Sequence, residues 1–357
     1  MKRLRKILDS VGLRIKEGKF SRFYHSFQAL DNFIFAAAER PVHSPFGRDP
    51  LDVKRYMTLV IVAVTPAFFA SLYFFGFRIL LMFVVSYAAG GAAELLFSII
   101  RKEEVNEGFL VTGFLFPLIL PPALPLWLVA VGVVFGVVVG KEVFGGTGRN
   151  VFNPALVGRV FLALGYPSLM STQWIEPGSG IWGKLTEGLN VDSVSSATPL
   201  VLAKAGEFTD NLDLFFGRVL GSAGETSALM IIVGGLFLVM VGIASWRTVL
   251  SVLVSFAGFT AILHAVMPDR VGPVLFNLLS GGILFGTFFM ATDPVSGPIT
   301  RQARWAYGMI IGVVAVLIRS FSGFVEGVMF AILLGNTFAP LLDEVVIRAN
   351  SRRLARE

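Results

Sequence analysis

The sequence predicts an all-α polytopic membrane protein, with ten transmembrane helices in two inverted five-helix repeats that contain broken helices. Three observations support this fold class. The first is composition: 55% of the 357 residues are hydrophobic, 15% are charged, and the mean hydropathy is +0.74, whereas soluble domains carry about 25% charged residues. The second is a succession of apolar segments. The third is a sequence pattern that occurs once in each half of the chain.

Ten apolar segments are separated by polar or glycine-rich turns. A membrane-spanning helix needs about 20 mainly apolar residues, and a broken helix can be shorter. The segments occupy residues 57–75, 77–100, 109–120, 124–140, 151–166, 226–243, 246–266, 273–290, 304–318 and 323–342. They divide the chain into an N-terminal arm (1–56), a first repeat (57–166), a long loop (167–225), a second repeat (226–342) and a tail (343–357).

Basic residues orient these segments, because Lys and Arg accumulate on the cytoplasmic side of membrane proteins. With the N-terminus inside, 23 of the 30 Lys and Arg residues fall in cytoplasmic segments and 6 fall outside. Both termini are therefore predicted to be cytoplasmic, and the loop 167–225 is predicted to lie outside. The net charge of +6 is then explained by the excess of basic residues on the cytoplasmic side of the membrane. We therefore expect a lipid bilayer, and no nucleic acid, as partner.

The recurring pattern is Asn-x-Phe-x-Pro-x-Leu, at residues 150–156 and again at 336–342. Prolines also end the third segment (Pro117) and follow the eighth (Pro294). Because each half holds an odd number of segments, the second half must cross the membrane in the opposite sense. Inverted repeats with broken helices are typical of transporter cores, whose function lies near the repeat interface. Chance recurrence in an apolar helical protein is the alternative.

A glycine-rich stretch, KEVFGGTGRN at residues 141–150, precedes the fifth segment. Its glycines permit close backbone approach, and the helix start that follows offers free N–H groups to an anion or a carbonyl. Asn150 and Asn153 are more informative, because amides at the start of a membrane helix are costly unless they bond something, such as a planar ring with donors and acceptors. A tight turn between helices explains the glycines equally well.

In the outside loop, Thr198 precedes Pro199. This pair is typical of a helix N-cap followed by the first helical residue, and capping alone would explain it. A phosphate esterified to Thr198 would nevertheless lie at a helix N-terminus, where the helix dipole favours negative charge.

Five acids lie at or near membrane depth, where an ionisable group is a functional hypothesis by default. They are Glu94, Glu142, Asp293, Glu326 and Asp343. Carboxylates are suitable ligands for a hard cation. Glu94 lies deepest, whereas simple solvation competes for those near the predicted cytoplasmic ends.

The chain has no cysteine and only three histidines. Thiolate chemistry and Cys-ligated iron–sulfur or zinc sites are therefore excluded for this chain. Any redox chemistry would need an organic cofactor.

These stretches together resemble the family that contains the B subunit of the sodium-translocating NADH:quinone oxidoreductase. The similarity is carried by residues 104–112 (EVNEGFLVT), 141–161 (KEVFGGTGRNVFNPALVGRVF), 290–296 (MATDPVS) and 338–346 (FAPLLDEVV), and it extends over nearly the whole chain. It implies a membrane subunit of a six-subunit respiratory complex in the bacterial inner membrane. In such a complex, electrons from NADH reach ubiquinone while Na+ is exported.

The resemblance also implies where flavins are held. In the family, FMN is joined through its phosphate to a threonine in a motif like Asp-Gly-x-Ser/Thr-Gly-Ala-Thr. The matching residues here are Asp192, Ser195, Ala197 and Thr198, with Ser193 and Ser196 in place of the two glycines. Thr198 is thus the expected attachment residue, modified by a periplasmic flavin transferase. Non-covalent riboflavin is expected at Asn150 and Asn153.

Quinone reduction is associated in the family with a Gly-Gly-x-x-Glu stretch, here Gly90, Gly91 and Glu94. The Na+ pathway is associated with acids that match Asp293, Glu326 and Asp343. The implied partners are a periplasmic FMN subunit, an NADH-oxidising component that holds FAD and a 2Fe-2S cluster, and ubiquinone. Na+ would offset the charge that an electron creates in a low-dielectric core.

Three alternatives remain open from the sequence. The homologous D subunit of the Rnf ferredoxin:NAD+ oxidoreductase shares the flavinylated threonine, although the basic arm and the glycine-rich stretch favour the quinone enzyme. A stand-alone channel or transporter on the same fold would need neither flavin nor partner subunits. A purely structural membrane anchor would leave the paired asparagines and Glu94 without a role.

Overall fold

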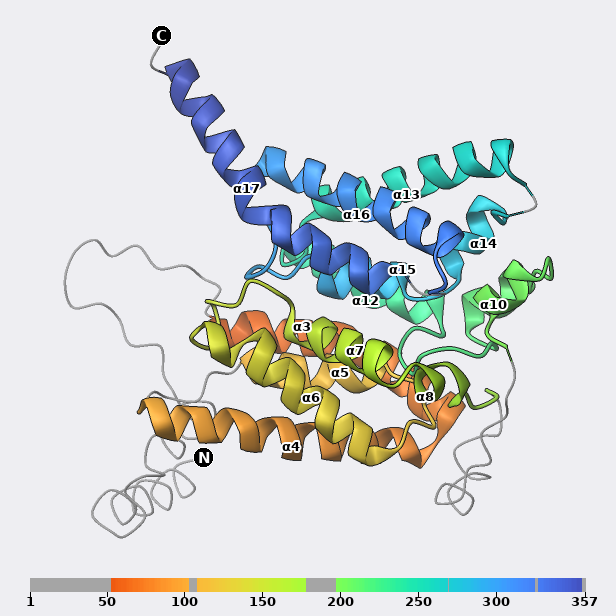
Figure 1. The fold of residues 1–357 in the computed structure, drawn as a ribbon, viewed down its shortest axis with the longest axis horizontal. Helices are drawn as coiled ribbons and strands as arrows, with labels where there is room; N and C mark the ends of the chain where they lie inside the picture. Colours follow the sequence, from red (N-terminus) through yellow and green to blue (C-terminus); the bar gives the residue numbers. More distant parts are fainter. Residues whose placement is uncertain (1–52, 103–107, 178–196, 269, 325–326, 355–357) are drawn as a thin grey trace.

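The computed structural model describes residues 53–102, 108–177, 197–268, 270–324 and 327–354. All regular structure in these residues is helical, as expected for a polytopic membrane protein. The helices form two layers whose axes run in similar directions, with α3 to α8 in one layer and α12 to α17 in the other (Figure 1).

The first layer is built from consecutive helices joined by short loops. They are α3 (Val53–Phe75), α4 (Phe77–Arg101), α5 (Gly108–Leu118), α6 (Leu126–Gly140), the 3-10 helix η2 (Glu142–Phe144), α7 (Pro154–Gly165) and α8 (Pro167–Thr172). Within this layer α6 packs against both α4 and α7, and α5 packs against α4.

The second layer begins after two short helices, α10 (Pro199–Lys204) and α11 (Asn211–Phe216). Its elements are α12 (Ala228–Val241), α13 (Trp246–Val266), α14 (Val274–Leu279), α15 (Ile283–Phe285), the π-helix η3 (Gly286–Met290), α16 (Arg301–Phe321) and α17 (Val328–Leu354). The two layers meet mainly where α3 packs on α12, and also where α7 packs on α17.

Six helices in the described residues are long and apolar enough to cross a membrane: α3, α4, α6, α13, α16 and α17. Three predicted spans correspond to shorter apolar helices, α5, α7 and α12. The predicted span 273–290 is not one helix, because it is divided among α14, α15 and η3. Gly281 lies at this break with a φ of 64°, a conformation that side-chain-bearing residues disfavour.

Two features of the sequence-based description can be compared with the helices. Helix α17 continues to Leu354, so the predicted limit between repeat and tail at residue 342 falls inside a helix. The Asn-x-Phe-x-Pro-x-Leu pattern also occupies different positions in the two halves. It leads into the start of α7, where Asn153 is the N-cap, but it lies within α17 in the second half. The pattern is therefore not evidence for equivalent helix positions.

Small residues let the helices approach closely, as in other membrane bundles. A Cβ on Gly158 of α7 would lie 2.5 Å from the carbonyl oxygen of Gly132 on α6. Between the layers, a Cβ on Gly234 of α12 would lie 1.9 Å from the carbonyl oxygen of Ala63 on α3. The close contact between α3 and α12 thus requires a glycine at position 234.

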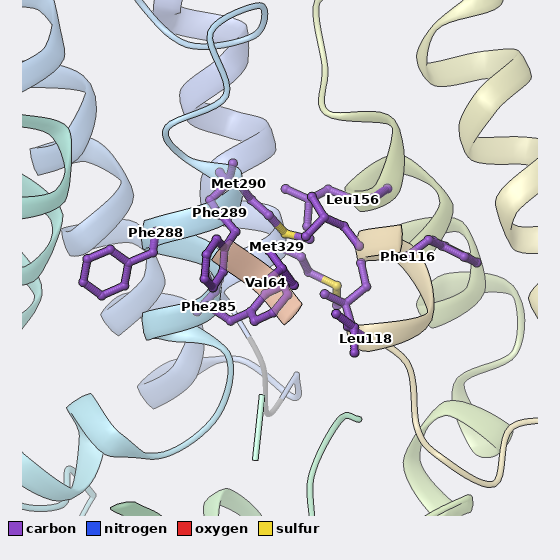
Figure 2. Close-up of a cluster of buried hydrophobic side chains, with 14 of the residues drawn as sticks. Val64, Phe116, Leu118, Leu156, Phe285, Phe288, Phe289, Met290 and Met329 are labelled. Carbon is purple, nitrogen blue, oxygen red and sulfur yellow. The ribbon is translucent and has the colours of Figure 1, made fainter. Parts of the chain in front are cut away.

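A cluster of buried apolar side chains fills the space between the layers (Figure 2). It joins residues from both halves, among them Val64, Phe116, Leu156, Phe285, Phe289, Met290 and Met329. Phe285 and Phe289 are tilted against each other with ring centroids 5.0 Å apart. This cluster packs the two halves of the chain against each other.

The ends of the helices separate the predicted site segments. The loop between α6 and α7 and the C-terminal end of α17 lie at one end of the layers, whereas α8 and α10 lie at the other (Figure 1). The α6–α7 loop, which contains the predicted riboflavin residues, and α10, which follows the predicted FMN residue, are therefore at opposite ends of the layers.

Candidate functional site

A narrow cleft lies between the two layers and is lined by residues of both. The first layer contributes Tyr56, Met57, Val60, Gly108, Val111, Thr112, Leu115, Lys141, Thr147, Asn150, Asn153 and Pro154; the second contributes Leu238, Ile243, Phe289, Thr292, Asp293, Pro294 and Val295. About 60 Å³ is free between the walls, room for about two water molecules. A larger planar ligand would require the walls to separate.

Asn153 lines this cleft and also starts helix α7. Its Oδ1 accepts hydrogen bonds from the backbone N–H groups of Ala155 at 3.1 Å and Leu156 at 3.4 Å. This is the usual N-cap arrangement, with Pro154 in the first helical turn. Among the described residues its Nδ2 group makes no hydrogen bond, so the amide has two donors left for a ligand in the cleft.

Both polar groups of the Asn150 side chain form hydrogen bonds within its own loop. Its Nδ2 donates to the carbonyl oxygen of Phe152 at 2.9 Å, and its Oδ1 accepts from the backbone N–H of Gly148 at 3.3 Å. Asn150 therefore fixes the loop that places Asn153. Both asparagines are buried, which agrees with the expectation that they need bonding partners.

Asn336, from the second occurrence of the pattern, reaches the same helix start. It is fully buried within α17 and hydrogen bonds with the hydroxyl of Tyr307 at 2.7 Å. In the amide orientation that satisfies its neighbours, its oxygen accepts from the backbone N–H of Asn153 at 3.3 Å. The two recurring segments thus meet, although the repeat does not place them equivalently.

Glu94 and Lys141 form a buried ion pair beside the cleft. The Glu94 Oε2 lies 2.7 Å from the Lys141 Nζ, and both side chains are at most 5% exposed. Lys141 Nζ also lies 3.7 Å from the Glu142 Oε1 and donates to the Thr147 Oγ1 at 3.3 Å. Arg101 completes the network through its 2.7 Å contact with the Glu142 Oε2 and a bond to the Glu142 carbonyl oxygen.

Gly90 and Gly91 lie one turn before Glu94 on α4, against a phenylalanine. A Cβ on Gly90 would lie 2.6 Å from the Phe109 ring, and one on Gly91 would lie 3.4 Å from it. The Lys141 Nζ is 5.9 Å from the centroid of that same ring. The glycines are thus needed for packing, and the predicted quinone residues are brought together with Lys141.

Thr198 lies apart from the cleft, at the first residue before α10. It is 9% exposed and its side chain does not cap the helix, although its carbonyl accepts from Val201 and Leu202. It lines a cavity of about 20 Å³ together with Ser222, Glu225 and Gly281. Ala197 is described next to it, whereas Asp192 and Ser195 lie outside the described residues.

Glu225 belongs to a second buried ion pair, which joins the two layers. Its Oε1 accepts from the Arg159 Nη1 at 2.9 Å, and the Arg159 Nη2 donates to the Ser222 Oγ at 3.2 Å. Arg159 comes from α7, whereas Glu225 precedes α12. The pair joins the two layers beside the cavity that Glu225 and Thr198 both line.

The predicted Na+ residues have different surroundings. Asp293 lines the cleft and accepts from the Ser296 Oγ at 2.8 Å and the Val295 N–H at 3.2 Å. Burial raises the pKa of the Asp293 carboxyl, and these hydrogen bonds partly oppose the rise. Asp343 instead accepts from Ile299 N, Thr300 N and Thr300 Oγ1 at 2.6–2.8 Å. It thereby caps helix α16 from outside that helix.

Asp293 and Asp343, the two of these acids that the structure describes, have separate sets of hydrogen-bond partners. Within the part of the chain that the structure describes, no three His, Asp or Glu residues are grouped as metal ligands. Glu326 lies outside that part.

Sequence reasoning misses two residues of this site. The sequence marks Lys141 only as the first residue of the glycine-rich stretch, because its burial depends on partners from another helix. It places Arg159 within a span and gives it no partner, although an arginine at membrane depth is itself a signal that a counter-charge lies nearby.

Known proteins resemble this chain over nearly its full length. The family model described as the NQR2, RnfD, RnfE family matches residues 41–352. The chain is 39% identical to the B subunit of the Na(+)-translocating NADH-quinone reductase of Azotobacter vinelandii over 411 aligned positions, with 99% of each chain covered. It is 40% identical to the protein of that name from Pseudomonas aeruginosa, with 99% covered, and 39% identical to that of Pseudoalteromonas atlantica, with 95% covered.

Proposed function

The chain belongs to the NQR2, RnfD, RnfE family, and on that premise we propose that it is the flavin-carrying membrane subunit of a Na+-translocating NADH:quinone oxidoreductase. The observation that carries this proposal is the full-length similarity to proteins named as the B subunit of that enzyme. The chain would act with the other members of a six-subunit complex, including a periplasmic FMN subunit and an NADH-oxidising subunit.

The proposed topology is a multi-pass protein of the bacterial inner membrane, with ten crossings in two inverted halves and both termini in the cytoplasm. The distribution of Lys and Arg supports this orientation. The separation of the α6–α7 loop from α10 at opposite ends of the layers agrees with it (Figure 1). The loop 167–225, with Thr198, would then face the periplasm.

Riboflavin is proposed to bind without a covalent link in the cleft between the layers. The polar lining suits such a ligand once the walls separate: the free Nδ2 donors of Asn153 and the hydroxyl of Thr147 could bond carbonyl and ring-nitrogen acceptors. Apolar side chains such as Met57 and Leu238 would contact the ring faces. A bound flavin would supply one-electron redox chemistry that no side chain of this chain offers.

Thr198 is proposed to carry FMN through a phosphoester. In the part of the chain that the structure describes, its side chain makes no cap bond to α10, so modification of the hydroxyl would not remove a cap. The transferase would be periplasmic, which matches the proposed position of the loop. Electrons would travel from this end of the molecule toward the cleft and then to ubiquinone near Glu94.

Na+ export is proposed to be coupled to this electron transfer. Negative charge added in a low-dielectric interior is costly unless a cation compensates it. Asp293 lines the cleft, which supports the proposal that it takes part in the Na+ pathway. Asp343 is engaged with α16, so its part in a Na+ pathway would require that cap to open.

The test is in-gel flavin fluorescence after denaturation in SDS. We expect the wild-type chain, co-expressed with its transferase, to carry fluorescence on its band and Thr198→Ala to carry none. Thr172→Ala serves as the control, since this exposed threonine also lies in the 167–225 loop. A wild-type band without flavin, or fluorescence retained by Thr198→Ala, would contradict the assignment.

The D subunit of an Rnf complex is the second candidate, because the matching family model includes that name. The electron donor and acceptor separate the two. Sodium-dependent reduction of a quinone by NADH supports the first proposal, whereas ferredoxin-dependent reduction of NAD+ supports the second.

A further inference from the structure

Lys141 stands between two predicted sites that the sequence treats as separate. Its side chain lines the cleft that holds Asn153, and its Nζ is 2.7 Å from the Glu94 carboxylate. Lys141 is 2% exposed. A lysine so deeply buried is costly to keep charged unless it is paired, so its partners determine what it can do.

The positive charge of Lys141 interacts with more than one neighbouring group. Glu94 is its nearest acid, Glu142 is 3.7 Å away, and Arg101 already neutralises much of Glu142 through a 2.7 Å contact. Thr147 gives only a neutral acceptor at 3.3 Å. Among the residues that the structure describes, the acid that lines the cleft is Asp293, whose carboxylate accepts hydrogen bonds from Ser296 and Val295. The charge balance of the cleft wall thus depends chiefly on the Lys141–Glu94 pair.

We propose that Lys141 is the counter-ion for negative charge that arises on a redox ligand in the cleft, and that Glu94 is its alternate partner. This inference rests on the proposed function, because it requires an electron-accepting ring in the cleft. An added electron makes the ring more negative, and the ammonium group then interacts with the ring at the expense of Glu94. Lys141 therefore sets the reduction potential of the ring through direct charge interaction.

The proposal predicts that neutralising Lys141 and neutralising Glu94 shift the reduction potential in opposite directions. Lys141→Met removes the positive charge and leaves a side chain of similar length, so reduction becomes less favourable. Glu94→Gln removes the competing carboxylate and leaves more of the Lys141 charge for the ring, so reduction becomes more favourable. A purely structural ion pair would not produce opposite shifts, because breaking it from either side disturbs the same packing.

The experiment is a spectroelectrochemical titration of the non-covalent flavin in the purified complex. We expect Lys141→Met to lower, and Glu94→Gln to raise, the one-electron reduction equilibrium by about tenfold each, which corresponds to about 59 mV in each direction. Lys141→Arg should stay close to wild type. Arg149→Met, which removes one charge at an exposed position of the same loop, is the matched control and should leave the potential unchanged.

The double variant Lys141→Met/Glu94→Gln guards against loss of folding, because replacing both members of a buried ion pair by neutral groups is tolerated better than removing one. Its potential should lie between those of the single variants. Shifts of the same sign in both single variants, or unchanged potentials in Lys141→Met and in the double variant, would overturn the inference. A wild-type complex without non-covalent flavin would instead refute the proposed riboflavin site.

Discussion

Replacing Asn153 tests whether the cleft holds a ligand through an amide group. The structure separates the two uses of this side chain: Oδ1 caps α7, whereas Nδ2 faces no described partner. Asn153→Ser keeps an N-cap oxygen but removes the two donors, while Asn153→Ala removes both functions. Loss of the cap costs about 0.5–2 kcal/mol of stability. Loss of a hydrogen bond to a ligand costs about 0.5–1.5 kcal/mol.

These magnitudes predict separate readouts. Thermal unfolding of the purified complex should show Asn153→Ser close to wild type and Asn153→Ala less stable. Riboflavin affinity, measured by flavin fluorescence after equilibrium dialysis, should fall about 2- to 12-fold in both variants, because about 1.4 kcal/mol corresponds to tenfold. Unchanged riboflavin affinity in Asn153→Ser would refute the assignment of Nδ2 to the ligand, whatever happens to stability.

Three further predictions concern the scaffold and can be checked by thermal unfolding in detergent. Arg159→Met should lower the stability of the folded chain by about 3–5 kcal/mol, because it leaves the Glu225 carboxylate buried without its hydrogen-bonded counter-charge. The double variant Arg159→Met/Glu225→Gln should recover most of that loss. Equal losses in the single and the double variant would contradict the ion-pair argument. Asp343→Ala should cost about 0.5–2 kcal/mol by removing the cap of α16, and no change would mean that this cap adds nothing. Gly234→Leu should lower stability by at least about 1–3 kcal/mol, because the new side chain forces α12 away from Ala63. Gly258→Ala, whose Cβ would meet open space, should be neutral or slightly stabilising. Similar effects of the two substitutions would refute the close-approach argument.

Hydropathy predicted the helices because lipid-facing helices are apolar on most sides, and length separates the six long ones from the shorter α5, α7 and α12. It did not predict the division of the 273–290 segment at Gly281 into α14, α15 and η3. The segment contains Ser280, Gly281 and Gly282, which favour a break, but the mean hydropathy of the whole segment does not register three residues. The conformation of one glycine at φ 64° decides the break.

Hydropathy begins the fifth segment at residue 151, whereas α7 begins at Pro154, where local capping rules place a helix start. Asn153 followed by Pro154 has the typical order of an N-cap and a first helical residue, and the structure has that arrangement. The Glu94–Lys141 pair was beyond such rules, because each residue comes from a different element. Long-range pairing of buried charges depends on how the helices pack, which periodicity does not specify.

The most direct test of the proposed function is Na+ accumulation by proteoliposomes that contain the whole complex. With NADH outside and a quinone in the bilayer, we expect wild-type vesicles to reduce quinone and accumulate radioactive Na+ in an orientation-dependent manner. Thr198→Ala should lose both activities together. Na+ accumulation that persists at the wild-type rate in Thr198→Ala, or quinone reduction by wild type without any Na+ movement, would contradict the proposed function.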